Sequence, residues 1–295
     1  MRKAWRVLYD SWLRFSADDG WAIASHIALS GLTSLFPFLI VVGALTGFVG
    51  SPSLAARATQ LVFETWPPEV AGPIASEVTN VLTRPRTGVA AFGALLGVYF
   101  ASSGVEAVRV GLNRAYDVRD TRAWWLLRIE SIVAVIIGAV ALIVFTFFVV
   151  LQPLVWEKAE KFVPQLAHLQ ALVTLVRIPT IAAILLIVMV IAHKYLPAGR
   201  RRFLDVLPGV ALTGVLWLSF GEGFGLYLAR FSQNYITTYA GLASVMVALV
   251  FLYTLSAMFI FGGEVNAAIM RATAMRRAAK KGKADAIARA GSGDV

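Results

Sequence analysis

Long apolar runs with few charged residues recur along the chain and alternate with short segments rich in charge. A helix of about 20 apolar residues can cross the roughly 30 Å hydrocarbon core of a bilayer. Six runs approach this length, at about 27–49, 88–108, 131–155, 171–192, 206–228 and 242–262. The pattern predicts an all-α, polytopic membrane protein with six transmembrane helices, and residues 1–270 as a single transmembrane domain.

Lysine and arginine are distributed unevenly between the segments that flank these runs. If the chain crosses six times, 20 of them fall on the side of the two termini and 6 on the opposite side. Membrane proteins concentrate basic residues in their cytoplasmic loops. The sequence therefore predicts cytoplasmic N- and C-termini. The first run is expected to be a retained anchor, because it is too long for the apolar region of a signal peptide.

Three segments outside the runs carry signals of their own. In residues 2–16, aromatic and leucine side chains recur every three or four positions among basic residues, which predicts an interfacial helix. A helix packed beneath the bundle is the alternative. Residues 51–87 contain five prolines and predict two short external helices. Residues 271–295 predict a basic cytoplasmic tail that is partly disordered, with a frayed helix from about Arg276 followed by disorder.

The composition excludes most soluble classes of protein. Hydrophobic residues make up 58% and charged residues 15% of the 295 positions, against about 45–50% and 25% in soluble domains. Without cysteine, the chain has no thiolate metal site, cysteine nucleophile or disulfide. The net charge of +10 fits basic loops that face anionic lipid, and nucleic acid is not expected as a partner.

Two ionisable residues lie deep inside the predicted spans, where such residues usually face a bundle interior or a wet cavity. Arg177 lies six residues past the outer end of its run, and Glu222 lies six residues before the outer end of the next run. At about 1.5 Å per residue both are some 9 Å below the external boundary. We expect an ion pair or a shared polar cavity, which serves either the structure or a substrate path.

A second polar group gathers near the predicted inner boundary. Its members are Glu106, Arg109, Asn113, Glu264, Asn266 and His26. The first three recur at spacings of three and four residues, so they share one face of a helix. Such a group either lines a substrate path or forms the interhelical hydrogen bonds that hold spans together.

The sequence contains few of the residue patterns that are typical of catalytic sites. The three histidines, His26, His168 and His193, are far apart, and neither a metal-binding spacing nor a GxSxG motif occurs. We therefore predict no catalytic residue, no metal and no cofactor, and we do not expect an enzyme.

Short motifs resemble those of the YihY/BrkB family of bacterial inner-membrane proteins, in order over about residues 15–270. They are DDGWAIASHIALSGLTSLFPF (18–38), YFASSGVEAVRVGLNRAYDV (99–118), YLPAGRRRFLDVLPGVALTGVLW (195–217), YLARF (227–231), YAGLAS (239–244) and GGEVNAAI (262–269). The sequence departs from the family at His26–Leu29, where a small residue and an Ala-Tyr pair are more usual.

The resemblance implies six transmembrane helices and a location in the bacterial inner membrane. Members have carried ribonuclease BN and serum-resistance labels, and some resemble proteins connected with lipid or lipopolysaccharide export. The ribonuclease label finds no chemical support in these residues, because phosphodiester hydrolysis normally needs a cluster of metal-holding carboxylates or histidines.

Prolines within the runs, buried ionisable residues and a basic cytoplasmic rim together predict a transporter or exporter of a lipid or other amphiphilic anion. The rim residues expected to contact its headgroup are Arg114, Arg200, Arg201 and Arg202. Membrane lipids are the expected partners, and a protein partner or a second copy is left open. The alternative is a non-transporting scaffold or accessory protein for envelope assembly.

Overall fold

The computed structural model describes residues 2–49, 87–146, 156, 170–239 and 242–291. Within these ranges the chain forms seven helices and no strand, which confirms the all-α prediction. The helices are α1 (Arg2–Ala17), α2 (Gly20–Val49), α5 (Thr87–Ala115), α6 (Trp124–Thr146), α8 (Gln170–Tyr195), α9 (Phe203–Tyr239) and α10 (Leu242–Gly291). The two external helices predicted within residues 51–87 lie outside the described residues.

Each of the six predicted runs overlaps one of the helices from α2 to α10. By length and composition, three described segments are apolar enough to cross a membrane: Leu95–Ala115, Phe203–Arg230 and Val245–Gly282. The apolar segment Pro179–Tyr195 of α8 is shorter. The described helices therefore supply three candidate spans.

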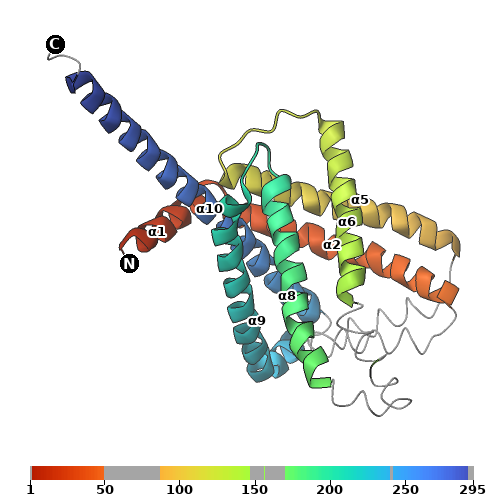
Figure 1. Ribbon diagram of the computed structural model, residues 1–295. Coiled ribbons are helices and arrows are strands. Elements are labelled where there is room, and N and C mark those ends of the chain that lie inside the picture. The colour runs from red at the N-terminus through yellow and green to blue at the C-terminus, as the bar shows by residue number, and fades with distance from the viewer. Residues whose placement is uncertain (1, 50–86, 147–155, 157–169, 240–241, 292–295) are drawn as a thin grey trace.

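The last helix continues well beyond the last apolar run. α10 continues past residue 262, where the sixth run ends, and through the predicted tail as far as Gly291. Alanine, lysine and arginine are strong helix formers, so the loss of hydrophobicity in the tail does not end the helix. In Figure 1 the C-terminal turns of α10 project away from the other helices, and both chain ends lie on the same side of the picture.

The helices pack mainly against their neighbours in the chain. α2 lies antiparallel along α5, α9 packs against α8 and α10, and α10 also contacts α2 and α1 (Figure 1). The buried core lies where the first turns of α2 and α9 meet the last turns of α5 and α8. It includes Phe15, Leu112, Met189, Val206 and Ile260.

The N-terminal helix α1 has two different apolar faces. Phe15 is buried, and its ring makes edge contacts with Trp21 at 4.9 Å and Phe261 at 6.1 Å between centroids. Trp5 and Tyr9 point outward and are 72% and 55% exposed. One face of α1 therefore packs against the other helices, which agrees with the alternative prediction of a helix beneath the bundle. A second face with aromatic side chains is exposed.

Helices α9 and α10 approach each other most closely at two glycines. A Cβ atom at Gly209 would overlap the carbonyl oxygen of Gly262, and a Cβ at Gly262 would overlap the hydroxyl of Thr213. Two turns further along α9, the indole of Trp217 donates a hydrogen bond to the carbonyl of Leu255 at 3.0 Å. Small residues permit this kind of backbone approach between helices in apolar surroundings.

Gly209→Ala should therefore lower the stability of the protein, because the new methyl group has to push α9 away from α10. We expect a loss of about 1–3 kcal/mol, measured as a drop in thermal midpoint of the detergent-solubilised chain. Gly221→Ala is the matched control on the same helix. No described atom lies within 4 Å of its added methyl group, so its stability should stay unchanged or rise slightly. Equal losses in both variants would contradict the close contact.

Candidate functional site

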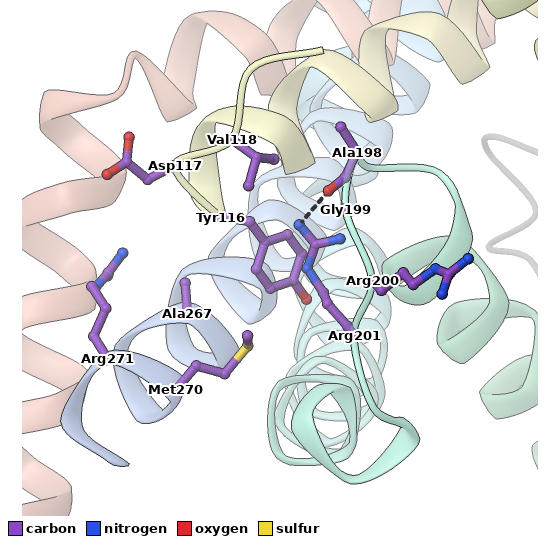
Figure 2. Close-up of a pocket in the computed structure, with 10 residues that line it drawn as sticks. All are labelled: Tyr116, Asp117, Val118, Ala198, Gly199, Arg200, Arg201, Ala267, Met270 and Arg271. Carbon is purple, nitrogen blue, oxygen red and sulfur yellow. Dashed lines mark hydrogen bonds between the residues drawn. The ribbon is translucent and has the colours of Figure 1, made fainter. Parts of the chain in front are cut away.

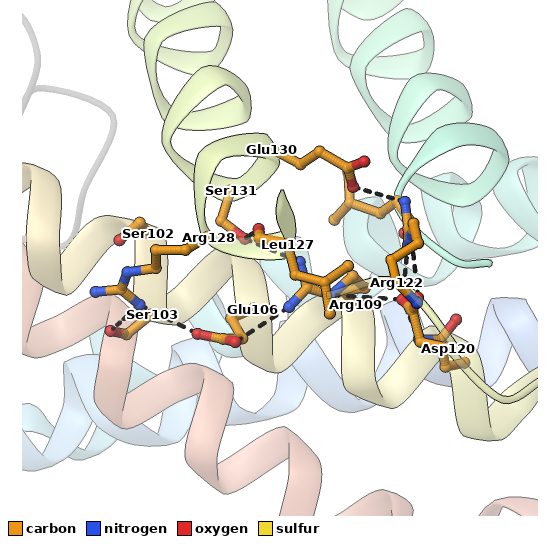
Figure 3. Close-up of polar contacts among 12 residues, drawn as sticks. Ser102, Ser103, Glu106, Arg109, Asp120, Arg122, Leu127, Arg128, Glu130 and Ser131 are labelled. Carbon is orange, nitrogen blue, oxygen red and sulfur yellow. Dashed lines mark hydrogen bonds and ion pairs between the residues drawn. The ribbon is translucent and has the colours of Figure 1, made fainter. Parts of the chain in front are cut away.

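Two polar networks and a pocket lie at the end of the bundle that holds the buried core. The first network joins α5 to α6 (Figure 3). The buried guanidinium of Arg109 donates to the carbonyl of Leu127 at 2.9 Å, to Ser131 Oγ at 3.1 Å and to Glu106 at 3.1 Å. Glu106 also accepts a hydrogen bond from Arg128 at 3.1 Å. These contacts hold α6 across α5.

The same network continues into the connection between α5 and α6. Arg122 donates to Asp120 and to Glu130, each at 2.6 Å, and reaches the carbonyl of Leu196 at 3.3 Å. The hydrogen bond from Arg122 lowers the pKa of Asp120 to about 2, and the same bond raises the pKa of Arg122. The connection is thereby tied to the end of α8.

Asn113 joins this network to the segment between α8 and α9. Its carbonyl oxygen accepts a hydrogen bond from the backbone N–H of Ala198 at 2.7 Å, and its amide donates to Asp120 at 3.3 Å. One buried side chain thus fixes two connections at the same end of the bundle.

The second network is centred on Asn266, which is fully buried in α10. Its amide nitrogen donates to the hydroxyl of Tyr116 at 3.1 Å and to the carbonyl of Val206 at 3.0 Å. Its oxygen accepts from the backbone N–H of Gly209 at 2.6 Å. Tyr116 Oη lies 3.2 Å from His193 Nδ1. Asn266 therefore links α10 to α9, to the end of α5 and, through Tyr116, to α8.

Two turns shape the surface above this network. The N–H groups of Asp117 and Val118 donate to the carbonyls of Arg114 and Asn113, each at 2.9 Å, which is a Schellman cap at the end of α5. Asp117 takes the left-handed conformation of this cap, with a φ of 54°. Opposite it, Gly199 has a φ of 89°, a conformation that suits glycine.

Between these turns and α10 lies a pocket of about 260 Å³ (Figure 2). Its lining residues are Tyr116, Asp117, Val118, Ala198, Gly199, Arg200, Arg201, Ala267, Met270 and Arg271. Three of these are arginines and one is a carboxylate. The excess of positive charge suits an anion, and a guanidinium group recognises phosphate oxygens with two parallel hydrogen bonds.

Arg201 and Tyr116 form the rigid wall of the pocket. The guanidinium carbon of Arg201 lies 3.9 Å from the centre of the Tyr116 ring, a cation–π contact, and Nη2 donates to the carbonyl of Ala198 at 3.0 Å. Burial lowers the pKa of Arg201 and raises the pKa of Tyr116 to about 12. At neutral pH Tyr116 is therefore a neutral phenol.

Arg271 forms the opposite wall, on the side of Asp117 (Figure 2). Its Nη2 atom lies 3.9 Å from Oε2 of Glu264, which is about two helical turns earlier in α10. Glu264 is 1% exposed, and neither carboxylate oxygen accepts a hydrogen bond within the described part of the chain. A buried carboxylate with so few donors is unusual and marks this wall as a candidate functional element.

Comparison with known proteins agrees with the resemblance drawn from the short motifs. The sequence profile described as Virulence factor BrkB matches residues 11–287. The chain belongs to the BrkB family.

Individual relatives of this BrkB-family chain span most of its length. The putative ribonuclease-like protein YfkH of Bacillus subtilis (strain 168) is 27% identical over 86% of this chain and 91% of its own. A UPF0761 membrane protein of Tolumonas auensis is 24% identical over 88% of this chain and 83% of its own. Another, of Rhodospirillum centenum, is 26% identical over 87% of this chain and 55% of its own. No solved structure gives a significant match.

The family and its apolar helices identify a membrane protein. In the BrkB-family chain, the predicted inner-boundary residues Glu106, Arg109 and Asn113 do lie in one network. Asn266 is the centre of the second network. Glu264 lies next to Arg271, which lines the pocket. His26 is exposed on α2 instead.

The predicted basic rim divides in the structure. Arg200 and Arg201 line the pocket. Arg114 forms an ion pair with Asp19 at 2.8 Å. Arg202, which follows Arg201 in the sequence, is exposed and does not line the pocket.

The predicted pair deeper in the spans remains a prediction. The side chain of Arg177 lies outside the described residues, and Glu222 is exposed on α9.

Sequence reasoning does not select Tyr116, His193 or Arg271 as site residues. Tyr116 lies in the Ala-Tyr motif, His193 is far from the other histidines in sequence, and Arg271 belongs to the basic segment after the last run. In the parts of the chain that the structure describes, no three His, Asp or Glu side chains gather as a group that could hold a metal ion.

Asp120→Asn should change the acid stability of the protein. The folded state favours the Asp120 carboxylate, with a pKa near 2 against an ordinary 3.8. Its stabilising contribution is complete above the ordinary value and is lost as the pH falls toward 2. Thermal midpoints measured across this range should therefore fall more steeply for the wild type than for Asp120→Asn.

Asp10→Asn, on an exposed part of α1, controls for the removal of a negative charge and should keep the wild-type acid profile. A profile of Asp120→Asn that matches the wild type would contradict the role of the Arg122 hydrogen bond.

Proposed function

We propose that this BrkB-family chain is a multi-pass protein of the bacterial inner membrane, with six spans and cytoplasmic termini. The six helices from α2 to α10 coincide with six apolar runs, and the excess of lysine and arginine on one side supports this orientation. In this arrangement the pocket between α5, α10 and the α8–α9 connection opens toward the cytosol.

We further propose that the protein transports a lipid or other amphiphilic anion and is not an enzyme. The observation that carries this proposal is that three arginines, Arg200, Arg201 and Arg271, line one pocket beside long apolar helices. A phosphate-bearing headgroup would bind the guanidinium groups while its acyl chains stay in lipid. The protein needs no cofactor for this binding step.

The exposed face of α1 supports contact with the membrane surface. Trp5, Leu8, Tyr9 and Leu13 are all exposed, and the helix also carries four basic residues. An apolar face flanked by basic residues is typical of a helix that lies in the interface of an anionic membrane. The contact of Phe15 with Phe261 would hold this helix against α10 at the same time.

Single cysteines placed in the chain should report its orientation, because the natural sequence contains none. In intact cells, a membrane-impermeant thiol reagent should label a cysteine at Ser76 and leave one at Ser292 unlabelled. After the inner membrane is permeabilised, both should react. Labelling of position 292 in cells with an intact inner membrane would refute cytoplasmic termini.

Transport can be measured in proteoliposomes that carry fluorescent phosphatidylglycerol, with a reductant that bleaches only the outer leaflet. We expect the wild type to move the labelled anionic lipid between leaflets faster than protein-free vesicles. Arg200→Gln combined with Arg271→Gln should slow this movement roughly 10-fold or more, because each loss of a charged hydrogen bond costs about 1.5–3 kcal/mol.

Arg202→Gln is the matched control, since Arg202 is exposed next to the pocket residues and does not line the pocket. It should transport at the wild-type rate. Wild-type protein that binds phosphatidylglycerol without moving it would favour the scaffold alternative. Cleavage of RNA by the purified protein with a divalent metal would refute the non-enzymatic assignment.

A further inference from the structure

The guanidinium of Arg271 lies between the anion pocket and the carboxylate of Glu264. On one side it lines the anion pocket, and on the other its Nη2 atom lies 3.9 Å from the Glu264 carboxylate. Its side chain is 29% exposed, against 1% for Glu264, so Arg271 reaches the pocket while Glu264 stays behind it. One cation therefore serves both a buried carboxylate and an incoming anion.

The backbone of α10 beside Glu264 is closely packed. The neighbouring Gly263 packs so closely that a Cβ there would lie 3.1 Å from Leu112 and 3.3 Å from Ala115. The helix is thus pinned against the end of α5. Isolated buried carboxylates are costly unless they are paired or bind a proton.

The charges around Glu264 come from several elements. Arg14 of α1, Asp18 of the α1–α2 junction and Arg271 of α10 act on Glu264 itself. Asp117, after α5, acts on Arg271, and His193 of α8 lies next to Gly263. The carboxylates of Asp18 and Asp117 add negative charge to the surroundings and do not compensate Glu264. When Arg271 turns to an anion in the pocket, Glu264 keeps only the influence of Arg14 among these cations, and a bound proton would neutralise the charge that Arg271 leaves uncompensated.

We propose that Glu264 is a proton-binding site coupled to the anion pocket through Arg271. Binding of an anionic headgroup draws Arg271 away from Glu264, which takes up one proton from the cytosolic solvent, and release of the anion reverses both steps. No covalent bond to the anion forms or breaks. This coupling rests on the proposed function, because it links a proton to binding at that same pocket.

The coupling can be tested by titration calorimetry of the full-length protein in detergent with short-chain phosphatidylglycerol. The charge of this phosphodiester lipid stays constant at neutral and mildly alkaline pH. Repeating the titration in two buffers of different ionisation enthalpy gives the number of protons taken up per lipid bound. At mildly alkaline pH we expect the wild type to take up as much as about one proton, and its affinity to fall by up to about tenfold for each pH unit on the alkaline side.

Glu264→Gln imitates the protonated acid and should bind without proton uptake, with an affinity at mildly alkaline pH above that of the wild type. Arg271→Gln should bind more weakly, also without proton uptake, and gives an independent test should the first variant not fold. Asp10→Asn, a matched removal of a negative charge at an exposed site on α1, should keep the wild-type proton uptake.

The outcomes separate the two proposals. Wild-type binding that takes up no proton across the mildly alkaline range, or unchanged uptake in Glu264→Gln, would overturn the coupling and leave the proposed function standing. Absence of any phosphatidylglycerol binding to the wild type at every pH would refute the anion site itself, and the coupling with it.

Discussion

The structure depends on hydrogen bonds made by one buried amide. Asn266 satisfies the backbone N–H of Gly209, the carbonyl of Val206 and the hydroxyl of Tyr116, all within an apolar helix bundle. Buried polar groups without partners are costly, so these bonds fix the register of α9 on α10 and the position of the end of α5. The glycines that allow the two helices to approach are a condition for this arrangement.

The anion pocket is a consequence of the same arrangement. The hydroxyl of Tyr116 accepts a hydrogen bond from Asn266, and the guanidinium of Arg201 stacks on one face of its ring. The Schellman cap of α5 and the turn at Gly199 then bring two connections together over α10. A cationic surface is therefore built on a rigid base, while Arg271 remains more accessible than Arg201.

Helix content, the apolar runs and the family could be predicted from the sequence, because each depends on composition and short-range order. The shared face of Glu106, Arg109 and Asn113 also follows from helical periodicity alone. The extent of α10 could not be predicted, because apolar character indicates where a span ends and not where a helix ends. Nor could Arg201 be separated from Arg202, two adjacent arginines with opposite exposure.

Composition and periodicity are enough to show that this chain belongs in lipid, since so much apolar and so little charged surface has no stable arrangement in water. They also locate the helical segments. Only the packing of the helices places Arg271 in one pocket with Arg200 and Arg201 and buries Glu264 behind it. The physical reason is that the pocket joins Arg271 to arginines about 70 positions away, and that the burial of Glu264 depends on contacts with other helices, neither of which local spacing encodes.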